Sequence, residues 1–235
     1  MERRSNGCTK KINDMYHKRI DNKQALSSTV FNLFTDAVGG SIQEFSDTLY
    51  SKFTVEAFFY SDDVNYFQIA QYFQKTVIPH KIAVYQAGLE MSRKEWFKEN
   101  KEQFLYNLWI HDMSKFSANE SYGYAMHDFK SKAPDILFEQ AWLHHKNHNE
   151  HHPEYWLNPN KEGVLSPMEM PTIYVLEMIA DWIGAGAVYG SSLEEWLPKN
   201  LHKFELHEAT AGKLAKFLKD MDFNIFHKDG RLFCK

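Results

Sequence analysis

Apolar side chains recur at helical spacing along most of this 235-residue chain, and this pattern restricts the fold more than any other feature. From Ser27 onward the apolar positions fall three or four residues apart, which is typical of amphipathic helices. We find no internal repeat and no alternation of strands with helices. The sequence therefore predicts a mostly α-helical protein with a single helical domain.

The ends of several predicted helices are marked by capping residues or prolines. The helices span residues 27–38, 42–53, 65–89 with a kink at Pro79, 93–110, 134–150, a segment opened by a capping box at Ser166–Glu169, and 192–220 opened by a second capping box. After them, apolar pairs on either side of Asp229-Gly230 predict a small C-terminal β-hairpin. The run Gly184-Ala185-Gly186-Ala187 predicts close packing between helices, because it continues a helix and follows no strand.

The N-terminal part differs in composition from the rest of the chain. Residues 1–23 carry seven Lys and Arg against three acidic residues and few apolar positions, which is typical of a solvated arm. We therefore divide the chain into an N-terminal extension, residues 1–60, with this basic arm and two short helices, and a helical domain, residues 61–235.

Composition and charge exclude several classes of protein. The chain has 27 Lys and Arg against 31 Asp and Glu, a net charge of −4, which argues against a dedicated nucleic-acid binder. It contains no apolar stretch of signal-peptide type and no run of about 18 apolar residues, so we expect no membrane span. The two cysteines, Cys8 and Cys234, lie near opposite ends and form no disulfide framework, which favours a reducing, cytoplasmic setting.

Histidine is the residue type that stands out. The chain has 12, and seven of them lie within the 42 residues from His111 to His152. Helical spacing places a set of titratable residues on inward helix faces: His80, His111, Asp112, His144, His148, His151, Glu177 and Asp181. Burying such groups without partners costs on the order of several kcal/mol each. The sequence therefore predicts a divalent metal site whose imidazole and carboxylate ligands suit zinc, manganese, iron, cobalt or nickel.

The order of four of these residues resembles a known signature. The lone His80, the adjacent pair His111-Asp112 and the distal Asp181 resemble the HD-domain superfamily of metal-dependent phosphohydrolases, whose members carry these ligands on separate helices. The resemblance spans residues 80–181. It implies an HD-type helical domain in which these four residues hold a metal ion.

The residues after the HD pair extend this resemblance. The stretch HDMSKF is similar to the HDxGK form of the superfamily, with Ser114 in place of glycine, and the resemblance implies that Lys115 contacts substrate phosphate. The stretches AWLHHKNHNEHHPEYW and MPTIYVLEMIADW further resemble an uncharacterised HD-like family common in phages and bacteria, over about residues 65–190. That closer likeness implies no particular substrate.

A second metal ion is implied by those superfamily members that bind two. In them extra histidines hold the second ion, and the aspartate of the HD pair bridges both. Here we choose His144 and His151, because they share one helical stripe. His145 and His152 lie one position around the helix and are the alternatives if the helix is rotated or ends early. Glu177 is expected to accept a hydrogen bond from a ligand histidine and so orient it.

Together these features predict a metal-dependent phosphohydrolase, a phosphatase or a phosphodiesterase, in which a metal-activated water attacks a phosphate ester. Asp112 and Lys115 are the expected catalytic residues. The resemblance implies that the substrate is a nucleotide or a similar small phosphate ester. Two alternatives stay open: a di-iron oxygenase with the same ligands, and a non-catalytic ligand-binding module that keeps the fold. The native metal separates the first alternative from hydrolysis.

Overall fold

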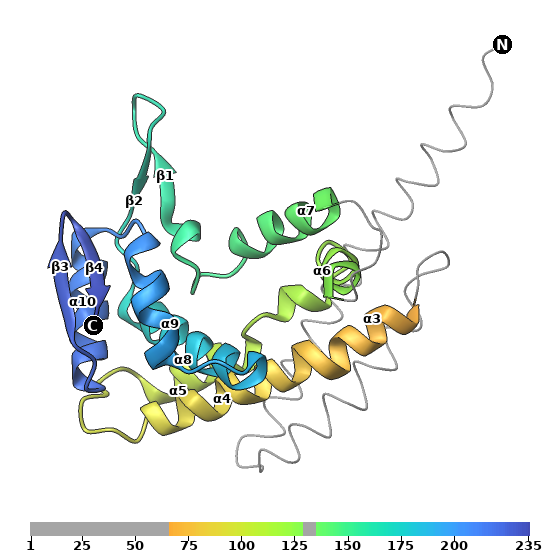
Figure 1. The fold of residues 1–235 in the computed structure, drawn as a ribbon, viewed down its shortest axis with the longest axis horizontal. Coiled ribbons are helices and arrows are strands. Elements are labelled where there is room, and N and C mark those ends of the chain that lie inside the picture. The colour runs from red at the N-terminus through yellow and green to blue at the C-terminus, as the bar shows by residue number, and fades with distance from the viewer. Residues whose placement is uncertain (1–65, 129–134) are drawn as a thin grey trace. The chain divides into compact units, whose positions relative to one another are not determined.

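The computed structural model of the protein describes residues 66–128 and 135–235. The described part is mostly helical and ends in a small β-hairpin, as the periodicity predicts (Figure 1). The predicted extension, residues 1–60, and its two short helices lie outside the described residues, so the boundary at residue 60 stays a prediction.

Two short antiparallel hairpins accompany the helices. The elements are α3 Tyr66–Tyr72, the π-helical segment η1 Phe73–Val77, α4 Ile78–Met91, α5 Lys101–Ile110, η2 Met113–Phe116, α6 Ser121–Asp128, α7 Asp135–Lys146, η3 Pro153–Trp156, β1 Leu157–Pro159, β2 Leu165–Pro167, α8 Thr172–Tyr189, α9 Leu193–Asn200, η4 Leu201–Lys203, α10 Glu208–Asp220, β3 Ile225–Lys228 and β4 Arg231–Cys234. Strand β1 pairs with β2, and β3 pairs with β4.

The close packing of α4 against α8 sets the position of the candidate site. A Cβ atom at Gly184 of α8 would lie 2.6 Å from the backbone nitrogen of Val84 in α4, so only glycine permits this approach. The predicted role of the Gly184 run in helix packing is thereby confirmed. Since α4 carries His80 and α8 carries Asp181, the contact brings these two side chains together.

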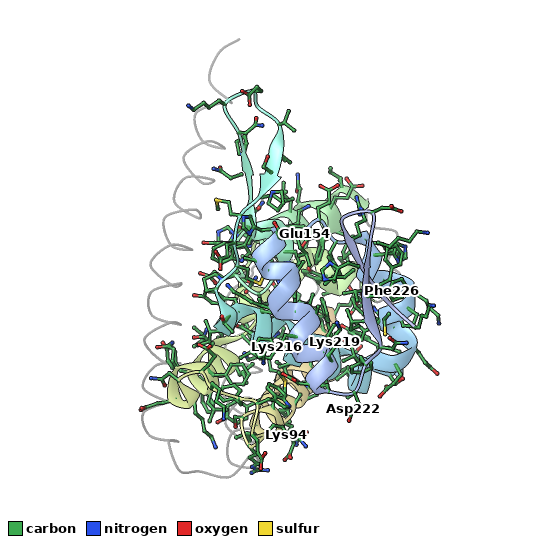
Figure 2. The ribbon with its side chains drawn as sticks, turned by 90° about the vertical axis from the view of Figure 1, so that its left-hand side faces the viewer. Lys94, Glu154, Lys216, Lys219, Asp222 and Phe226 are labelled. Atoms are coloured by element: carbon green, nitrogen blue, oxygen red, sulfur yellow. The ribbon has the colours of Figure 1, made fainter. Side chains whose placement is uncertain are left out.

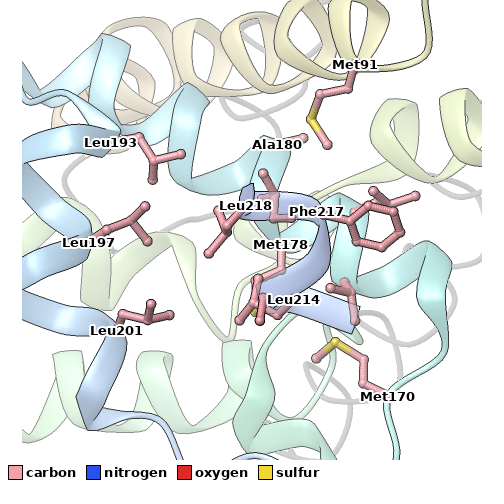
Figure 3. Close-up of a cluster of buried hydrophobic side chains, with 14 of the residues drawn as sticks. Met91, Met170, Met178, Ala180, Leu193, Leu197, Leu201, Leu214, Phe217 and Leu218 are labelled. Carbon is pink, nitrogen blue, oxygen red and sulfur yellow. The ribbon is translucent and has the colours of Figure 1, made fainter. Parts of the chain in front are cut away.

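The main hydrophobic core lies between α8, α9, α10 and α4. Figure 3 shows its centre, where apolar side chains from these helices meet Leu201 of η4 and Met170 just before α8: Met91, Met178, Ala180, Leu193, Leu197, Leu214, Phe217 and Leu218. A second cluster between α3 and α6 buries Ile69, Tyr72, Phe73, Val77, Ala125 and Met126. Burial of apolar surface in these clusters stabilises the helices that carry the polar site.

The helix predicted over 65–89 is continuous, but its irregular turn precedes Pro79. Residues Phe73–Val77 are π-helical, and α4 begins at Ile78. Proline has no amide hydrogen to donate to the carbonyl four residues earlier, and the wider turn accommodates this missing hydrogen bond. His80 lies in the first turn of α4, just beyond this segment, and is buried, as predicted.

Two predicted helix starts are wrong. The helix predicted over 93–110 begins only at Lys101, because Asn100 accepts a hydrogen bond from the amide of Gln103 and caps it there. Ser166 does not cap a helix either. It lies in β2, opposite Asn158 in β1, and α8 begins five residues after Pro167, at Thr172.

The C-terminal part follows the prediction more closely. Ser192 accepts a hydrogen bond from the amide of Glu195 and caps α9, although η4 and a short linker separate this helix from α10. Asp229 and Gly230 have φ angles of 51° and 75° and form the turn of the β3–β4 hairpin. Figure 2 views α10 with its exposed Lys216 and Lys219 beside this hairpin. Within the described ranges, we find no helix with the length and apolar character of a membrane span.

Candidate metal centre

Two groups of potential metal ligands meet at one aspartate. The first ligand group consists of His80, His111, Asp112 and Asp181, and the second consists of Asp112, His145, His151 and His152. Within each group, one ligand atom of every residue lies within 4.8 Å of the others. Both groups are largely buried, so their polar atoms need binding partners inside the protein.

The shared residue, Asp112, lies in a sharp turn after α5. His111 ends this helix, and Asp112 adopts the left-handed conformation with a φ of 56°. Aspartate tolerates this conformation better than most residues, because its short side chain can make local hydrogen bonds. The turn continues into η2, and the amide of Lys115 donates to the carbonyl oxygen of Asp112 at 3.0 Å. The turn therefore holds the His111-Asp112 pair against α4 and α8.

In the first ligand group, nitrogen and oxygen atoms from three segments converge. His80 Nε2 lies 3.1 Å from Asp181 Oδ1 and 3.3 Å from Asp112 Oδ2. His111 Nε2 lies 3.4 Å from His80 Nε2 and 3.4 Å from Asp181 Oδ1. Two imidazoles and two carboxylates facing one point are a typical ligand set for a transition metal.

The second ligand group uses the other oxygen of Asp112. This atom, Oδ1, lies 3.4 Å from His145 Nε2 and 3.5 Å from His151 Nε2. Asp112 Oδ1, His151 Nε2 and His152 Nε2 are buried and have no hydrogen-bond partner among the described residues. Three orphaned lone-pair atoms at one place fit a cation, which would satisfy all of them together.

Glu177 fixes the orientation of two of these histidines. Its Oε1 accepts hydrogen bonds from Nδ1 of His111 at 3.1 Å and from Nδ1 of His151 at 3.3 Å. Because a carboxylate accepts these bonds, the Nδ1 atoms carry the hydrogens and the Nε2 lone pairs face the ligand groups. Glu177, His111 and His151 also lie close enough together to hold a metal ion, but we interpret their contacts as hydrogen bonds that support the two ligand groups from behind. The predicted orienting role matches this geometry.

Glu120 does the same for His145. This fully buried carboxylate accepts from His145 Nδ1 at 2.9 Å, which leaves His145 Nε2 facing Asp112. Its other oxygen accepts from His144 Nδ1 at 2.5 Å. His144 therefore points away from both ligand groups, stacks on His148 and lines a hollow of about 330 Å³ between α6 and α7.

The charges of the two ligand groups differ. Burial opposes a charge on His111, but Asp112, Asp181 and Glu177 around it raise its pKa to about 9. Burial lowers the pKa of His145 to about 4 and that of His152 to about 3. His145 and His152 therefore offer neutral imidazoles near pH 7, whereas a cation in the first group would replace the proton of His111.

Two lysines contact the HD pair. Lys81 is completely buried and donates from Nζ to the carbonyl oxygens of Trp109, at 3.0 Å, and of His111. These carbonyls lie at the C-terminal end of α5, where backbone acceptors lack helical partners and a positive charge is favourable. Lys115 contacts the side chain of the aspartate, with Nζ 2.7 Å from Asp112 Oδ2.

The sequence matches a known family over most of the described region. The match covers residues 69–222, and the family is described as a family of unknown function, DUF5662. This chain belongs to the DUF5662 family. The matched segment contains every residue of both ligand groups. No curated protein and no solved structure matches the chain.

The structure of this DUF5662 protein brings together most of the residues predicted for the site. They are His80, His111, Asp112, Lys115, His151 and Asp181. His144 and the exposed His148 lie outside both ligand groups, and the alternatives His145 and His152 take part instead. The reason is that α7 ends at Lys146 and turns the face of Ala141 and His145 inward.

Sequence reasoning missed two buried charged residues of the site. Glu120 follows an unremarkable polar turn, and Lys81 follows His80 on an otherwise apolar helix. A lysine at an inward-facing position was a usable signal for Lys81, because such a residue requires acceptors nearby. For Glu120 the sequence offers no such signal.

The neighbouring histidines of α7 give a matched test of the second ligand group. We expect His145→Ala to remove one equivalent of bound metal. The substitution deletes the ligand nitrogen Nε2 and also the Nδ1–H group that donates to Glu120. His144→Ala, one position away, should keep the full metal content. Elemental analysis of the purified variants measures both. Equal metal loss in the two variants would contradict the assignment of His145.

Proposed function

We propose that this DUF5662 protein is a metal-dependent phosphohydrolase that acts on a nucleotide or a similar small phosphate ester. The observation that carries the proposal is the fixed ammonium of Lys115 beside two ligand groups that share Asp112. Besides pairing with the Asp112 carboxylate, this ammonium supports the binding of a phosphate anion on the metal.

The proposed ligands are distributed between two ions. His80, His111, Asp112 and Asp181 would hold the first, and Asp112, His145, His151 and His152 would hold the second. Divalent ions in such sites lower the pKa of bound water and stabilise charge on phosphoryl oxygens. Glu177 and Glu120 keep the ligand nitrogens aimed inward. The donor set suits manganese, zinc, iron, cobalt or nickel.

Lys115 supplies positive charge without acting as a ligand. Burial disfavours its ammonium form, but the Asp112 carboxylate outweighs this effect and raises the pKa of Lys115 above its ordinary value. The side chain therefore stays charged at neutral pH, with only 13% of its surface exposed. In the proposed reaction Lys115 neutralises phosphoryl oxygens, as its place in the HDxxK stretch implies.

A screen with matched lysine variants tests this proposal. The purified chain is first analysed for bound metal and then assayed against nucleotides and simple phosphate esters with Mn, Co, Ni, Mg and Fe added. We expect Lys115→Ala to keep its metal but to lose activity by about 10²-fold or more. Lys115→Arg should recover only part of it, because guanidinium is larger and planar. Lys94→Ala, at an exposed lysine, is the control and should behave like the unmodified protein.

Two outcomes of this screen would overturn the proposal. Full activity of Lys115→Ala on every ester that is hydrolysed would show that the lysine has no part in the reaction. Two bound irons with a visible charge-transfer band, and no hydrolysis with any ion, would favour an oxygenase instead.

A further inference from the structure

One buried hydrogen-bonding group beside Lys115 has no partner. The hydroxyl of Tyr124, on α6, is buried and makes no hydrogen bond with any described residue. Such a group loses its bonds to water on folding and gains nothing in return, which costs stability. Unpartnered polar groups of this kind in native proteins call for an explanation, and an absent ligand is one.

Tyr124 belongs to the surroundings of the proposed phosphate site. Nζ of Lys115 lies 5.7 Å from the centre of its ring, on the aromatic face. The ring of His145 meets it edge to face at 5.8 Å, and the ring of Tyr72 stacks on it at 5.9 Å. These contacts hold the phenol in place between α3, α7 and the turn that carries Asp112 and Lys115.

The chemistry of a phenol separates Tyr124 from the three orphaned atoms of the second ligand group. Asp112 Oδ1, His151 Nε2 and His152 Nε2 present lone pairs, which a metal ion satisfies. A protonated phenol presents an O–H donor, which needs an acceptor. Burial, with Asp112 and Glu120 nearby, raises the pKa of Tyr124, so the hydroxyl keeps its proton at neutral pH. The missing partner is therefore a hydrogen-bond acceptor, such as a phosphoryl oxygen, and not a cation.

We propose that the Tyr124 hydroxyl donates a hydrogen bond to an oxygen of the phosphoryl group that Lys115 neutralises. Tyr124 is then a second substrate-binding residue, contributed by α6. This inference rests on the proposed function and extends it. The site would hold a phosphate group between metal ions on one side and two protein donors, an ammonium and a phenol, on the other.

Inorganic phosphate is the probe for this inference. It is titrated calorimetrically into the full-length protein with its metal bound, and thermal unfolding is followed without phosphate. We expect Tyr124→Phe to weaken phosphate binding by about 10-fold or more, the effect of one hydrogen bond to a charged group. Without phosphate, the same variant should unfold about 2–4 °C higher, because it no longer buries an unpartnered hydroxyl. A tyrosine bonded inside the protein would respond in the opposite way.

Tyr122→Phe is the matched control. It removes the same atom from the same helix, at a half-buried tyrosine beside the α6–α7 hollow, and should leave phosphate affinity unchanged. Unchanged phosphate affinity in Tyr124→Phe, while Lys115→Ala loses it, would overturn this inference and leave the proposed function standing. If the unmodified metal-bound protein bound no phosphate, the proposed function would fail and this inference with it.

Discussion

Asp112→Asn is expected to release metal from both ligand groups and to reduce hydrolysis to the uncatalysed level. Asp112 contributes Oδ2 to the first group and Oδ1 to the second, so a single change weakens both. Asparagine keeps the shape of the side chain and tolerates the left-handed conformation of this turn. The substitution therefore removes charge and leaves the backbone in place, whereas Asp112→Ala would also strain the turn.

The control for this variant is Asp222→Asn. Asp222 is exposed, follows the end of α10 and has a φ of 69°, so it shares the positive φ of Asp112 without its ligand neighbours (Figure 2). It should keep full metal content and activity. Metal analysis and circular dichroism report both properties for the two variants. Asp112→Asn with its metal intact and its helix content unchanged would contradict the shared-ligand arrangement.

Lys81→Ala is expected to have the largest effect on stability, a loss of about 3–5 kcal/mol in the free energy of unfolding. The substitution empties a fully buried volume and leaves the carbonyls of Trp109 and His111 without their donor. The gain from no longer burying an ammonium offsets part of this loss, since burial lowers the pKa of Lys81 to about 7. The cavity and the orphaned carbonyls outweigh it.

Lys81→Met separates the two causes. Methionine fills a similar volume but cannot donate, so its loss should be limited to about 1–3 kcal/mol from the orphaned carbonyls. Denaturant unfolding of the metal-free proteins measures all three stabilities. A Lys81→Ala variant within about 1 kcal/mol of the unmodified protein would show that this lysine does not support the end of α5.

The first ligand group was predictable because its residues follow from local rules. His80 and Asp181 lie on inward stripes of helices that the apolar periodicity indicates. His111 and Asp112 end such a helix. The chain needs only to pack these helices together, and Gly184 permits that contact.

The second ligand group was harder because α7 has two plausible apolar faces. Ala141, the buried apolar residue of α7, precedes His144 by three residues and His145 by four, so helical spacing allows either histidine to share its face. Packing decides between them: a Cβ at Gly123 of α6 would lie 2.8 Å from the Cβ of Ala141, and in this close contact His145 is the histidine that reaches Asp112. Such tertiary contacts are not encoded in the periodicity of one helix.

The two glutamates that accept hydrogen bonds from ligand histidines show the same limit of prediction from one sequence. Glu177 was predictable, because it lies one turn before Asp181 on the same stripe of α8. Glu120 comes from a different segment, and its contact with His145 spans 25 positions of the chain. A single sequence carries no signal for a pairing of this kind.

The metal content of the purified, unmodified chain tests the central claim most directly. Two ligand groups that share Asp112 predict about two equivalents of a transition metal per chain, either as purified or after addition of a small excess and removal of unbound ions. A ratio of one would confine binding to a single group. A chain that retains no metal, and whose unfolding temperature does not rise with any of the added ions, would contradict the account.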